Sequence, residues 1–222
     1  MKTSFKKNNC VAVIPFFNEE KFISEIINKT LVHVDKIILI NDGSTDNSLR
    51  NIPQSDSIIL INLEKNFGKG FALNVGYKSS FLTNYECVIT LDADLQHDPE
   101  YISNFIEKIN EYDIVIGNRK KDLKKMPIQR IISNRLTSYL LTLKVKQKIL
   151  DSQCGFRIYR KDCLKNILPT SKGFEAESEI LVNAGRKNYQ IGFTDIPTIY
   201  GEEKSKMKAF MAIKGFIKIL FS

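Results

Sequence analysis

The chain has 222 residues, of which 43% are hydrophobic and 26% are charged, and its formal net charge is +8. This length predicts one domain, and the ordinary apolar fraction excludes disordered, collagen-like and disulfide-rich classes. No apolar run approaches the ~20 residues that cross a bilayer, and the stretch MKTSFKKNNC lacks the apolar region of a signal peptide. The four cysteines are scattered without a CxxC pair, so we expect reduced thiols in the cytoplasm and neither a zinc site nor a disulfide framework.

Short runs of β-branched residues predict seven strands, at residues 11–15, 36–41, 57–63, 87–92, 113–117, 156–160 and about 189–196. The first five are continuously apolar, which is typical of buried parallel strands. Helices are expected between them, at about residues 19–33, 46–52, 69–81 and 99–110. The alternation predicts an α/β fold with a Rossmann-like, doubly wound and mostly parallel sheet flanked by helices.

The positive charge is concentrated in two late segments. Residues 1–118 have a net charge of −5 and residues 149–203 of −1, whereas residues 119–148 carry +9 and residues 204–222 carry +5. Such segregation favours a polyanionic partner, either nucleic acid or an anionic membrane, although a solvated charged face gives the same pattern. The sequence has no zinc finger and no aromatic RNA-binding signature, so we expect no nucleic-acid partner.

Both basic segments have the apolar periodicity of helices. One series recurs at helical spacing and comprises Ile128, Ile131, Ile132, Leu136, Tyr139, Leu140 and Leu143. In residues 207–221 a second series shares one side of a helical wheel and comprises Phe210, Ile213, Phe216, Ile217, Leu220 and Phe221. Lysines occupy the other side, at Lys204, Lys208, Lys214 and Lys218. This pattern predicts basic amphipathic C-terminal helices at a membrane surface, but a helix that docks on the domain core would have it too.

Acidic side chains follow the predicted strands, where ligands bind to open parallel sheets. They are Glu19, Asp42, Asp46, Asp92 and Asp94. Five carboxylates at one edge repel one another unless a cation is bound. Asp92 and Asp94 are two residues apart, so in extended backbone they point the same way and suit Mg²⁺ or Mn²⁺ held against a diphosphate. Asp42 lies in a DGS turn, where its carboxylate is free to accept a hydrogen bond from a base or a ribose.

Other charged residues are candidates for phosphate binding or for structural roles. The best candidates to meet phosphate oxygens are Arg119, Arg130, Arg157 and Lys206, since a guanidinium presents a planar bidentate fork. Lys69 lies in the segment NFGKG, which lacks the Walker spacing, and it either contacts the nucleotide or only opens a helix. His97 is expected to support its loop and not to bind metal. An alternating acidic string either begins a helix or approaches an acceptor, at Glu175, Glu177 and Glu179.

Seven segments of the sequence resemble motifs of one known family. They are PFFNEE, NDGSTDNS, LEKNFGKGFALNVGY, LDADLQHDPE, IGNR, DSQCGFRIY and IYGEEKSKM, between about residues 10 and 207. They are similar to the motifs of family 2 glycosyltransferases with the GT-A fold, in the branch of polyprenyl-phosphate (dolichol-phosphate-type) sugar transferases. Two positions depart from that branch, because Asn41 stands where it has an aspartate and Phe17 where it usually has a tyrosine.

Each candidate residue is assigned a role, by the resemblance for most nucleotide and metal residues and by side-chain chemistry for the basic ones, which are Lys69, Arg119, Arg130, Arg157 and Lys206. The residues assigned to the nucleotide are Pro15, Phe17, Glu19, Asp42, Lys69 and Asp92, with Asp42 receiving the imide N–H of the base. The residues that would surround a Mg²⁺ or Mn²⁺ cofactor are Asp92, Asp94 and Gln96. Those assigned to catalysis are Asp94, Arg119 and Lys206, and those assigned to the acceptor phosphate are Arg130 and Arg157.

We expect a single glycosyltransferase domain over residues 1–222, with a nucleotide-binding half at about 10–118, an acceptor-side half at about 119–206 and an amphipathic membrane-surface helix at 207–222. The implied reaction is inverting transfer of a sugar from a nucleoside-diphosphate sugar to a polyprenyl phosphate, by a peripheral protein on the cytoplasmic, inner face of an anionic membrane. The acceptor oxyanion is already a nucleophile, so no strong general base is needed.

Three alternatives to this reaction stay open at the level of the sequence. They are a glycosyltransferase with a sugar or protein acceptor, a nucleotidyltransferase that makes a sugar nucleotide, and a non-catalytic module adsorbed to a membrane. Asp42 would accept from uracil or guanine alike, so the residues specify neither UDP nor GDP. They also specify neither the sugar nor the oligomeric state.

Overall fold

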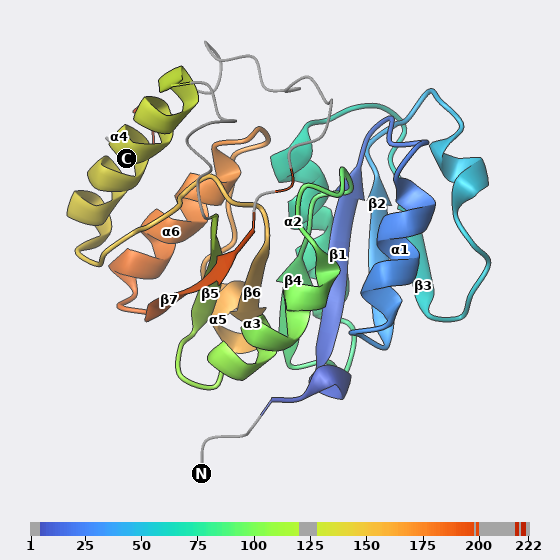
Figure 1. Cartoon of the computed structure of the whole chain (residues 1–222), viewed down its shortest axis with the longest axis horizontal. Coiled ribbons are helices and arrows are strands. Elements are labelled where there is room, and N and C mark those ends of the chain that lie inside the picture. Colours follow the sequence, from blue (N-terminus) through green and yellow to red (C-terminus); the bar gives the residue numbers. More distant parts are fainter. Residues whose placement is uncertain (1–4, 120–127, 198, 200–215, 218, 221–222) are drawn as a thin grey trace.

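The computed structural model describes residues 5–119, 128–197, 199, 216–217 and 219–220 (Figure 1). These residues form a seven-stranded sheet with the strand order β3-β2-β1-β4-β6-β5-β7. The strands are β1 (Cys10–Phe16), β2 (Lys36–Asn41), β3 (Ile58–Asn62), β4 (Cys87–Thr90), β5 (Ile114–Arg119), β6 (Arg157–Arg160) and β7 (Ile191–Ile196). All seven predicted strands are therefore confirmed.

Neighbouring strands are parallel except where β6 is one of the pair. β6 is antiparallel to both β4 and β5, and its first residue, Arg157, pairs with Thr90 at the carboxyl end of β4. Because β6 begins where β4 ends, the loop before β6 lies at the edge of the sheet from which the acidic motifs emerge. The predicted mostly parallel sheet is confirmed, and the reversal of β6 brings residues 151–156 to that edge.

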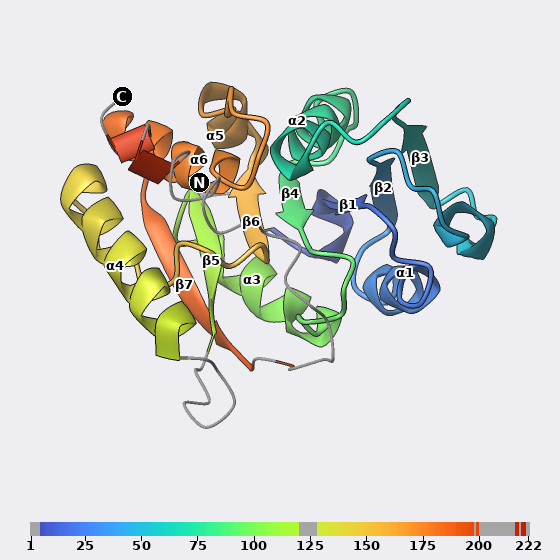
Figure 2. The ribbon, with the colours of Figure 1, turned by 90° about the horizontal axis from the view of Figure 1, so that it is seen from above.

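Helices cover both faces of this sheet (Figure 2). One face carries α1 (Ile23–Leu31) and α3 (Ile102–Lys108), and the other carries α2 (Lys69–Ser80), α5 (Lys161–Asn166) and α6 (Ala176–Arg186). α4 (Ile128–Val145) lies beyond the β7 edge of the sheet and packs on α6. Short 3₁₀ turns occur at Lys7–Asn9, Ser48–Asn51 and Pro99–Tyr101. The segment predicted as a helix at 46–52 is therefore only a 3₁₀ turn.

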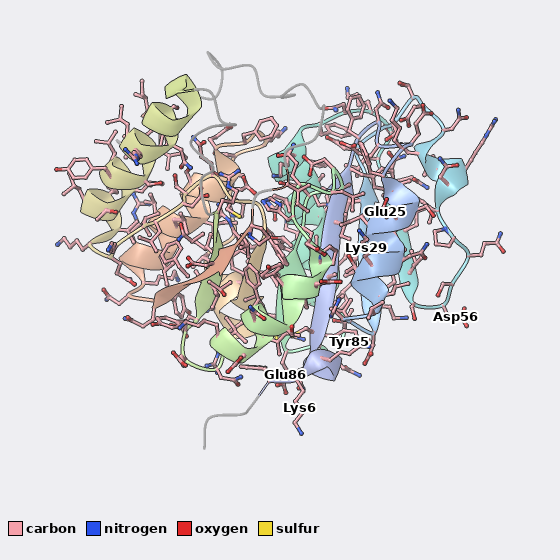
Figure 3. The ribbon with its side chains drawn as sticks, viewed as in Figure 1. Lys6, Glu25, Lys29, Asp56, Tyr85 and Glu86 are labelled. Atoms are coloured by element: carbon pink, nitrogen blue, oxygen red, sulfur yellow. The ribbon has the colours of Figure 1, made fainter. Side chains whose placement is uncertain are left out.

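The sequence of α1 illustrates how these helices attach to the sheet. Its inward residues recur at helical spacing and are fully buried, at Ile23, Ile26 and Ile27. Its outward side carries an ion pair of 2.8 Å between Lys29 and Glu25, one helical turn apart (Figure 3). Both of these charged side chains are about half exposed. The apolar stripe therefore holds α1 on the sheet, and the ion pair faces solvent.

The strands differ in how deeply they are buried. Every residue of β1 and β4 is buried, as continuous apolar runs predict. β3 differs, because Ile59 and Leu60 are 37% and 39% exposed. The prediction that residues 57–63 form a fully buried strand is therefore wrong. β3 is the end strand of the sheet and has a neighbour on one side only.

The predicted amphipathic helix at 207–222 lies largely outside the described residues, which include only 216–217 and 219–220 of it. These four residues are helical, and Ile219 is 4% exposed within the hydrophobic core. Phe216 and Leu220 pack against that core, whereas Ile217 is 49% exposed. The described part of this segment thus docks on the domain, which is the alternative to a membrane-surface helix. No helix in the described ranges is long and apolar enough to span a bilayer.

Candidate active site

The carboxylate of Asp42 anchors the loop that leads into α2. Its Oδ1 accepts a hydrogen bond from the backbone N–H of Phe67 at 2.8 Å, and its Oδ2 accepts one from Gly68 at 3.0 Å. Burial raises the pKa of Asp42 although both hydrogen bonds oppose the change. The side chain is only 3% exposed. Each Asp42 oxygen thus already accepts one backbone hydrogen bond, so a base would have to bind at a remaining lone pair of this carboxylate.

Lys69, the first residue of α2, joins three elements of the site. Its Nζ lies 2.6 Å from Oδ1 of Asp92, in the loop after β4, and 3.1 Å from Oε1 of Glu177, in the first turn of α6. Burial alone would lower the pKa of Lys69, but the two carboxylates raise it well above its usual value. The ammonium group is therefore charged at neutral pH and holds the acidic loop against α6.

Asp92 is fixed on a second side by the segment before β6. A Cβ atom built on Gly155 would overlap the Asp92 carboxylate, so only glycine allows this close approach. The carbonyl of Gly155 accepts a hydrogen bond of 2.9 Å from Oγ1 of Thr90, at the end of β4. Burial alone would raise the pKa of Asp92, but the Lys69 ammonium lowers it. Asp92 is thus an ionised carboxylate of fixed position.

The rest of the acidic loop turns sharply after Asp92. Leu95 has a φ of 57°, in the left-handed region, and the backbone N–H of Gln96 donates to Oδ1 of Asp94 at 3.1 Å. His97 is 4% exposed, and its Nε2 lies 3.6 Å from Sγ of Cys154. Burial lowers the pKa of His97 to about 4, so the ring is neutral at pH 7. His97 supports the loop from beneath, as the sequence predicts.

Arg119 ends β5 and is held by a carboxylate that the sequence analysis did not single out. Its Nε lies 2.7 Å from Oδ2 of Asp151 and its Nη2 lies 2.9 Å from Oδ1, which makes the pair bidentate. Asp151 is fully buried and also accepts from Nδ2 of Asn134 in α4 at 3.0 Å. Burial alone would raise the pKa of Asp151, but Arg119 lowers it. Arg119 therefore lies at the carboxyl edge with a fixed orientation.

Arg157 is not available to an acceptor phosphate, so that prediction is wrong. The residue is 0% exposed. Its Nε donates to the carbonyl of Cys154 at 2.7 Å, Nη1 to that of Glu177 at 2.8 Å and Nη2 to that of Ser152 at 2.9 Å. The guanidinium fork is therefore occupied by backbone oxygens and joins β6 to the start of α6.

The other predicted residues are placed as follows. Pro15 is buried in β1, Phe17 is half-buried just after it, and Glu19 is 8% exposed, with its backbone N–H donating to Oγ of Ser48 at 2.8 Å. Arg130 belongs to the backbone of α4, but its side chain lies outside the described part of the chain, as does the whole of Lys206. The structure thus brings Lys69 and Asp92 together at one site, whereas the side-chain contacts of Arg130 and Lys206 lie outside the described residues.

Sequence reasoning missed Asp151 as part of the site and missed the contact of Glu177 with Lys69. Asp151 lies in the segment DSQCGFRIY, which was singled out only as a motif. Glu177 belongs to the alternating acidic string, for which helix start and acceptor contact were both considered. Glu179 in the same string accepts hydrogen bonds from the backbone of Thr170 and Ser171, both at 2.9 Å, and so fixes the loop before α6. The alternating acidic residues therefore begin helix α6, and Glu177 in addition binds Lys69.

The acidic loop fits an ion shared with a diphosphate better than a metal held by protein alone. Among the residues that the structure describes, no three His, Cys, Asp or Glu side chains are grouped so that they could hold a metal ion. A Mg²⁺ ion on a nucleotide needs only one or two carboxylates, because phosphate oxygens and waters complete its shell. Asp92 already binds Lys69, and Asp94 lies two residues further along the same half-buried turn.

Comparison with known proteins agrees with this arrangement. The family model for glycosyl transferase family 2 matches residues 11–168. A UDP-N-acetylglucosamine–dolichyl-phosphate N-acetylglucosaminyltransferase of Methanococcus voltae is 32% identical over 86% of the chain and 85% of its own length. An undecaprenyl-phosphate 4-deoxy-4-formamido-L-arabinose transferase of Proteus mirabilis is 27% identical over 92% of the chain and 65% of its own length. The resemblance to polyprenyl-phosphate sugar transferases is thus confirmed.

The fold is also that of solved glycosyltransferases. The crystal structure of glucosyl-3-phosphoglycerate synthase from Mycobacterium tuberculosis, in complex with Mn²⁺, UDP and phosphoglyceric acid, superposes with a TM-score of 0.75 at 18% identity. The match covers 96% of this chain and 78% of that one. Together with the family model, which spans more than half of the chain, this identifies the protein as a glycosyltransferase with the GT-A fold that belongs to glycosyl transferase family 2.

Proposed function

We propose that the protein transfers a sugar from a nucleoside-diphosphate sugar to a polyprenyl phosphate, at the cytoplasmic face of an anionic membrane. The observation that carries this proposal is the acidic loop at residues 92–96, which Lys69 and Gly155 hold at the carboxyl edge of the sheet. The names of the relatives from Methanococcus voltae and Proteus mirabilis support a lipid phosphate as acceptor. Membership of the family favours this reaction over a nucleotidyltransferase or a non-catalytic module.

The nucleotide would bind across the ends of β1 and β2. Pro15 lies near the end of β1, Phe17 and Glu19 follow β1, and Asp42 follows β2. Since both Asp42 oxygens bind the backbone of Phe67 and Gly68, Asp42 would act on the nucleotide by fixing the shape of this loop. Lys69 would hold Asp92 in place and raise the local positive charge where the diphosphate lies.

Asp94 and Gln96 would hold a Mg²⁺ or Mn²⁺ ion, with Asp92 oriented beside them by Lys69. When bound, such an ion neutralises negative charge on the departing nucleoside diphosphate. The relevant donors are hard oxygen atoms, which both of these cations prefer. Structures of the Mycobacterium tuberculosis synthase with Mn²⁺ or Mg²⁺ support the choice of ions.

The transfer itself would be a single displacement at the anomeric carbon. The bond from this carbon to the diphosphate oxygen breaks while a phosphate oxygen of the acceptor forms the new bond from the opposite face. Arg119 would stabilise charge on the phosphates with the part of its guanidinium that Asp151 does not bind, and Lys206 is a second candidate for this role. Arg130 stays a candidate for the acceptor phosphate, whereas Arg157 does not.

The stereochemistry of the product tests this reaction. The whole chain is incubated with an α-linked sugar nucleotide, a polyprenyl phosphate and Mn²⁺, and the anomeric proton of the lipid product is examined by NMR. A β-linked sugar on the lipid phosphate is the expected result. An α-linked product would contradict a single displacement. Sugar that is released without attachment to the lipid would contradict a polyprenyl phosphate as the acceptor.

A further inference from the structure

The outward face of α4 is apolar, which is unusual for a helix at the surface of a domain. Leu136, Tyr139 and Leu143 are 55%, 61% and 59% exposed. They are spaced by three and four residues, so they form one stripe along the helix, which we call the α4 stripe. α4 lies at the end of the molecule beyond β7, where Figures 1 and 2 show no other labelled element outside it.

The inward face of the same helix is held by specific contacts, which fix how α4 is rotated about its axis. Asn134 donates to Asp151 at 3.0 Å, and the hydroxyl groups of Ser138 and Ser152 are 3.1 Å apart. Near the end of α4, Val145 packs closely on α6 at Gly185, where a Cβ atom would lie 2.8 Å from Cγ1 of Val145. A rotation that buried the α4 stripe would break these contacts and bury nothing comparable in their place.

The described charged side chains of α4 and of the loop after it are all basic. The exposed basic residues of α4 and of the loop after it are Arg135, Lys144, Lys146 and Lys148. The sequence has no Asp or Glu between residues 123 and 150. Asp151, which follows, is fully buried against Arg119. An apolar stripe on a helix whose described charged side chains are all basic is complementary to a surface with anionic headgroups over an apolar interior.

We propose that the outward face of α4 rests on an anionic membrane. This inference rests on the proposed function, which takes a lipid as acceptor and places the reaction at such a membrane. Leu136, Tyr139 and Leu143 enter the interfacial layer, where the amphipathic ring of Tyr139 is favoured. The flanking basic residues bind lipid headgroups. This assigns membrane contact to α4, whereas Ile219 of the C-terminal segment is buried in the core and is not available for such contact.

The position of α4 connects this surface to the active site. Asn134 on the inward face binds Asp151, and Asp151 binds Arg119 at the end of β5. A helix seated on the bilayer is therefore joined by two hydrogen-bonded steps to a residue proposed to meet phosphate. This arrangement would deliver the headgroup of a lipid acceptor to the carboxyl edge of the sheet.

Co-sedimentation with vesicles, without any substrate, tests the proposal. The variant carries Leu136→Gln, Tyr139→Gln and Leu143→Gln, and the matched control carries Leu82→Gln and Val32→Gln, at sites that are 90% and 66% exposed elsewhere. Circular dichroism melting confirms that both variants are folded. With vesicles of phosphatidylglycerol and phosphatidylcholine, the α4 stripe variant should partition at least ~10-fold more weakly than wild type. The control should partition like wild type.

A charge variant measures the electrostatic part. Replacement of Arg135, Lys144 and Lys148 by Gln should lower partitioning by roughly 100-fold, since each Lys or Arg near an anionic surface contributes about fivefold. Binding to purely phosphatidylcholine vesicles should be weak and unchanged by this variant. Equal binding of wild type and the α4 stripe variant to anionic vesicles would overturn the proposal. The proposal would also be overturned if light scattering showed a dimer for wild type and a monomer for the α4 stripe variant while both bound vesicles equally. The stripe would then contact a second copy of the chain.

A water-soluble acceptor separates this proposal from the proposed function. With a short-chain prenyl phosphate and no vesicles, the α4 stripe variant should transfer sugar within about twofold of wild type, because no membrane is involved. With a long-chain acceptor in anionic vesicles it should lose at least ~10-fold. If wild type transfers sugar to neither acceptor, the proposed function fails while the vesicle-binding result still decides the role of α4. Equal loss with both acceptors would overturn membrane docking as the role of the stripe.

Discussion

Lys69 determines the position of the acidic loop, because its ammonium group lies 2.6 Å from Asp92 and 3.1 Å from Glu177. Two carboxylates this close to one cation repel each other strongly if the cation is removed. The Lys69 side chain is 17% exposed and that of Asp92 is 26% exposed, so water reaches part of this cluster. The electrostatic contribution is therefore smaller than in a fully buried pair.

Replacement of Lys69 by methionine should abolish sugar transfer and lower the free energy of unfolding. We expect a loss of about 2 kcal/mol, below the roughly 3–5 kcal/mol of a fully buried pair, since solvent screens the remaining carboxylates. Denaturation in urea measures it. The exposed Lys172→Met serves as control and should change stability by less than about 0.5 kcal/mol. Adding Glu177→Gln should recover part of the loss, and additive effects of the two changes would contradict the proposed bridge.

The side chain of Arg157 should matter for stability and not for the acceptor. Arg157→Met leaves the carbonyl groups of Ser152, Cys154 and Glu177 without their donors, and at about 1 kcal/mol or more for each we expect a loss of at least ~3 kcal/mol. Arg160→Met, on the same strand, removes an ion pair of 3.8 Å with Asp162 and a cation–π contact of 5.2 Å with the Phe5 ring, and should cost about 1 kcal/mol. If the Arg157→Met protein were stable and only its KM for the acceptor were raised, this would instead support contact between Arg157 and the acceptor phosphate.

At the scale of elements, the site depends on the close approach of the loop before β6 to the loop after β4. A Cβ atom on Gly155 would overlap the Asp92 carboxylate, so Gly155→Ala must displace that carboxylate or one of the two loops. We expect at least a ~10-fold loss of kcat and weaker nucleotide binding, with a loss of stability of about 1–3 kcal/mol. Steady-state kinetics and thermal melting measure the two effects. Wild-type kinetics in this variant would show that the position of Asp92 does not limit the reaction.

Asp151 joins β5 to α4 and makes the stability of this part depend on pH. Its pKa is lower in the folded protein than the ordinary value of 3.8, because Arg119 outweighs the effect of burial. A lowered pKa stabilises the folded state above about pH 3.8, and this contribution is lost as pH falls through the folded pKa. Asp151→Asn should therefore cost about 3 kcal/mol at pH 7, and the difference from wild type should shrink below pH 4. A difference that stays constant from pH 7 to pH 3 would contradict this assignment.

Local patterns in the sequence predicted most elements, since continuous apolar runs and helical spacing are properties of a few neighbouring residues. The reversal of β6 is not such a property, because Arg157–Arg160 reads alike in either direction until it is paired with β4 and β5. The half-exposed state of β3 follows from its place at the end of the sheet. These features depend on contacts between residues far apart in the chain.

The candidate site was predictable where motifs place residues directly after strands, as for Asp92 and Asp94. It was not predictable where distant segments supply the partner. Glu177 lies in α6 yet binds Lys69, and the fork of Arg157 is filled by three carbonyl groups. An arginine chosen for its ability to bind phosphate can thus be buried as a structural residue, and only the fold distinguishes the two.

At the scale of the whole molecule, the excess positive charge and the α4 stripe lie outside the acidic half of the chain. Residues 1–118 carry −5 and supply the acidic loop, whereas residues 119–148 carry +9 and include α4. Sugar nucleotide and lipid phosphate are both anionic, so the sugar nucleotide would need a bound cation on the acidic half, whereas the lipid phosphate would meet basic side chains directly. We propose that this division separates a donor half at about 10–118 from an acceptor half at about 119–206.

The most direct measurement follows radiolabelled sugar from a nucleoside-diphosphate donor into lipid that is extracted with organic solvent. The reaction contains the whole chain, a polyprenyl phosphate and Mn²⁺, and it is repeated with Asp94→Asn and with excess chelator. The predicted result is labelled lipid with wild type and Mn²⁺, and a loss of at least ~100-fold with either change, since one carboxylate ligand or the ion itself is missing. Label that stays in water-soluble products, or lipid labelled equally by Asp94→Asn, would contradict the proposed transfer and the role of the acidic loop.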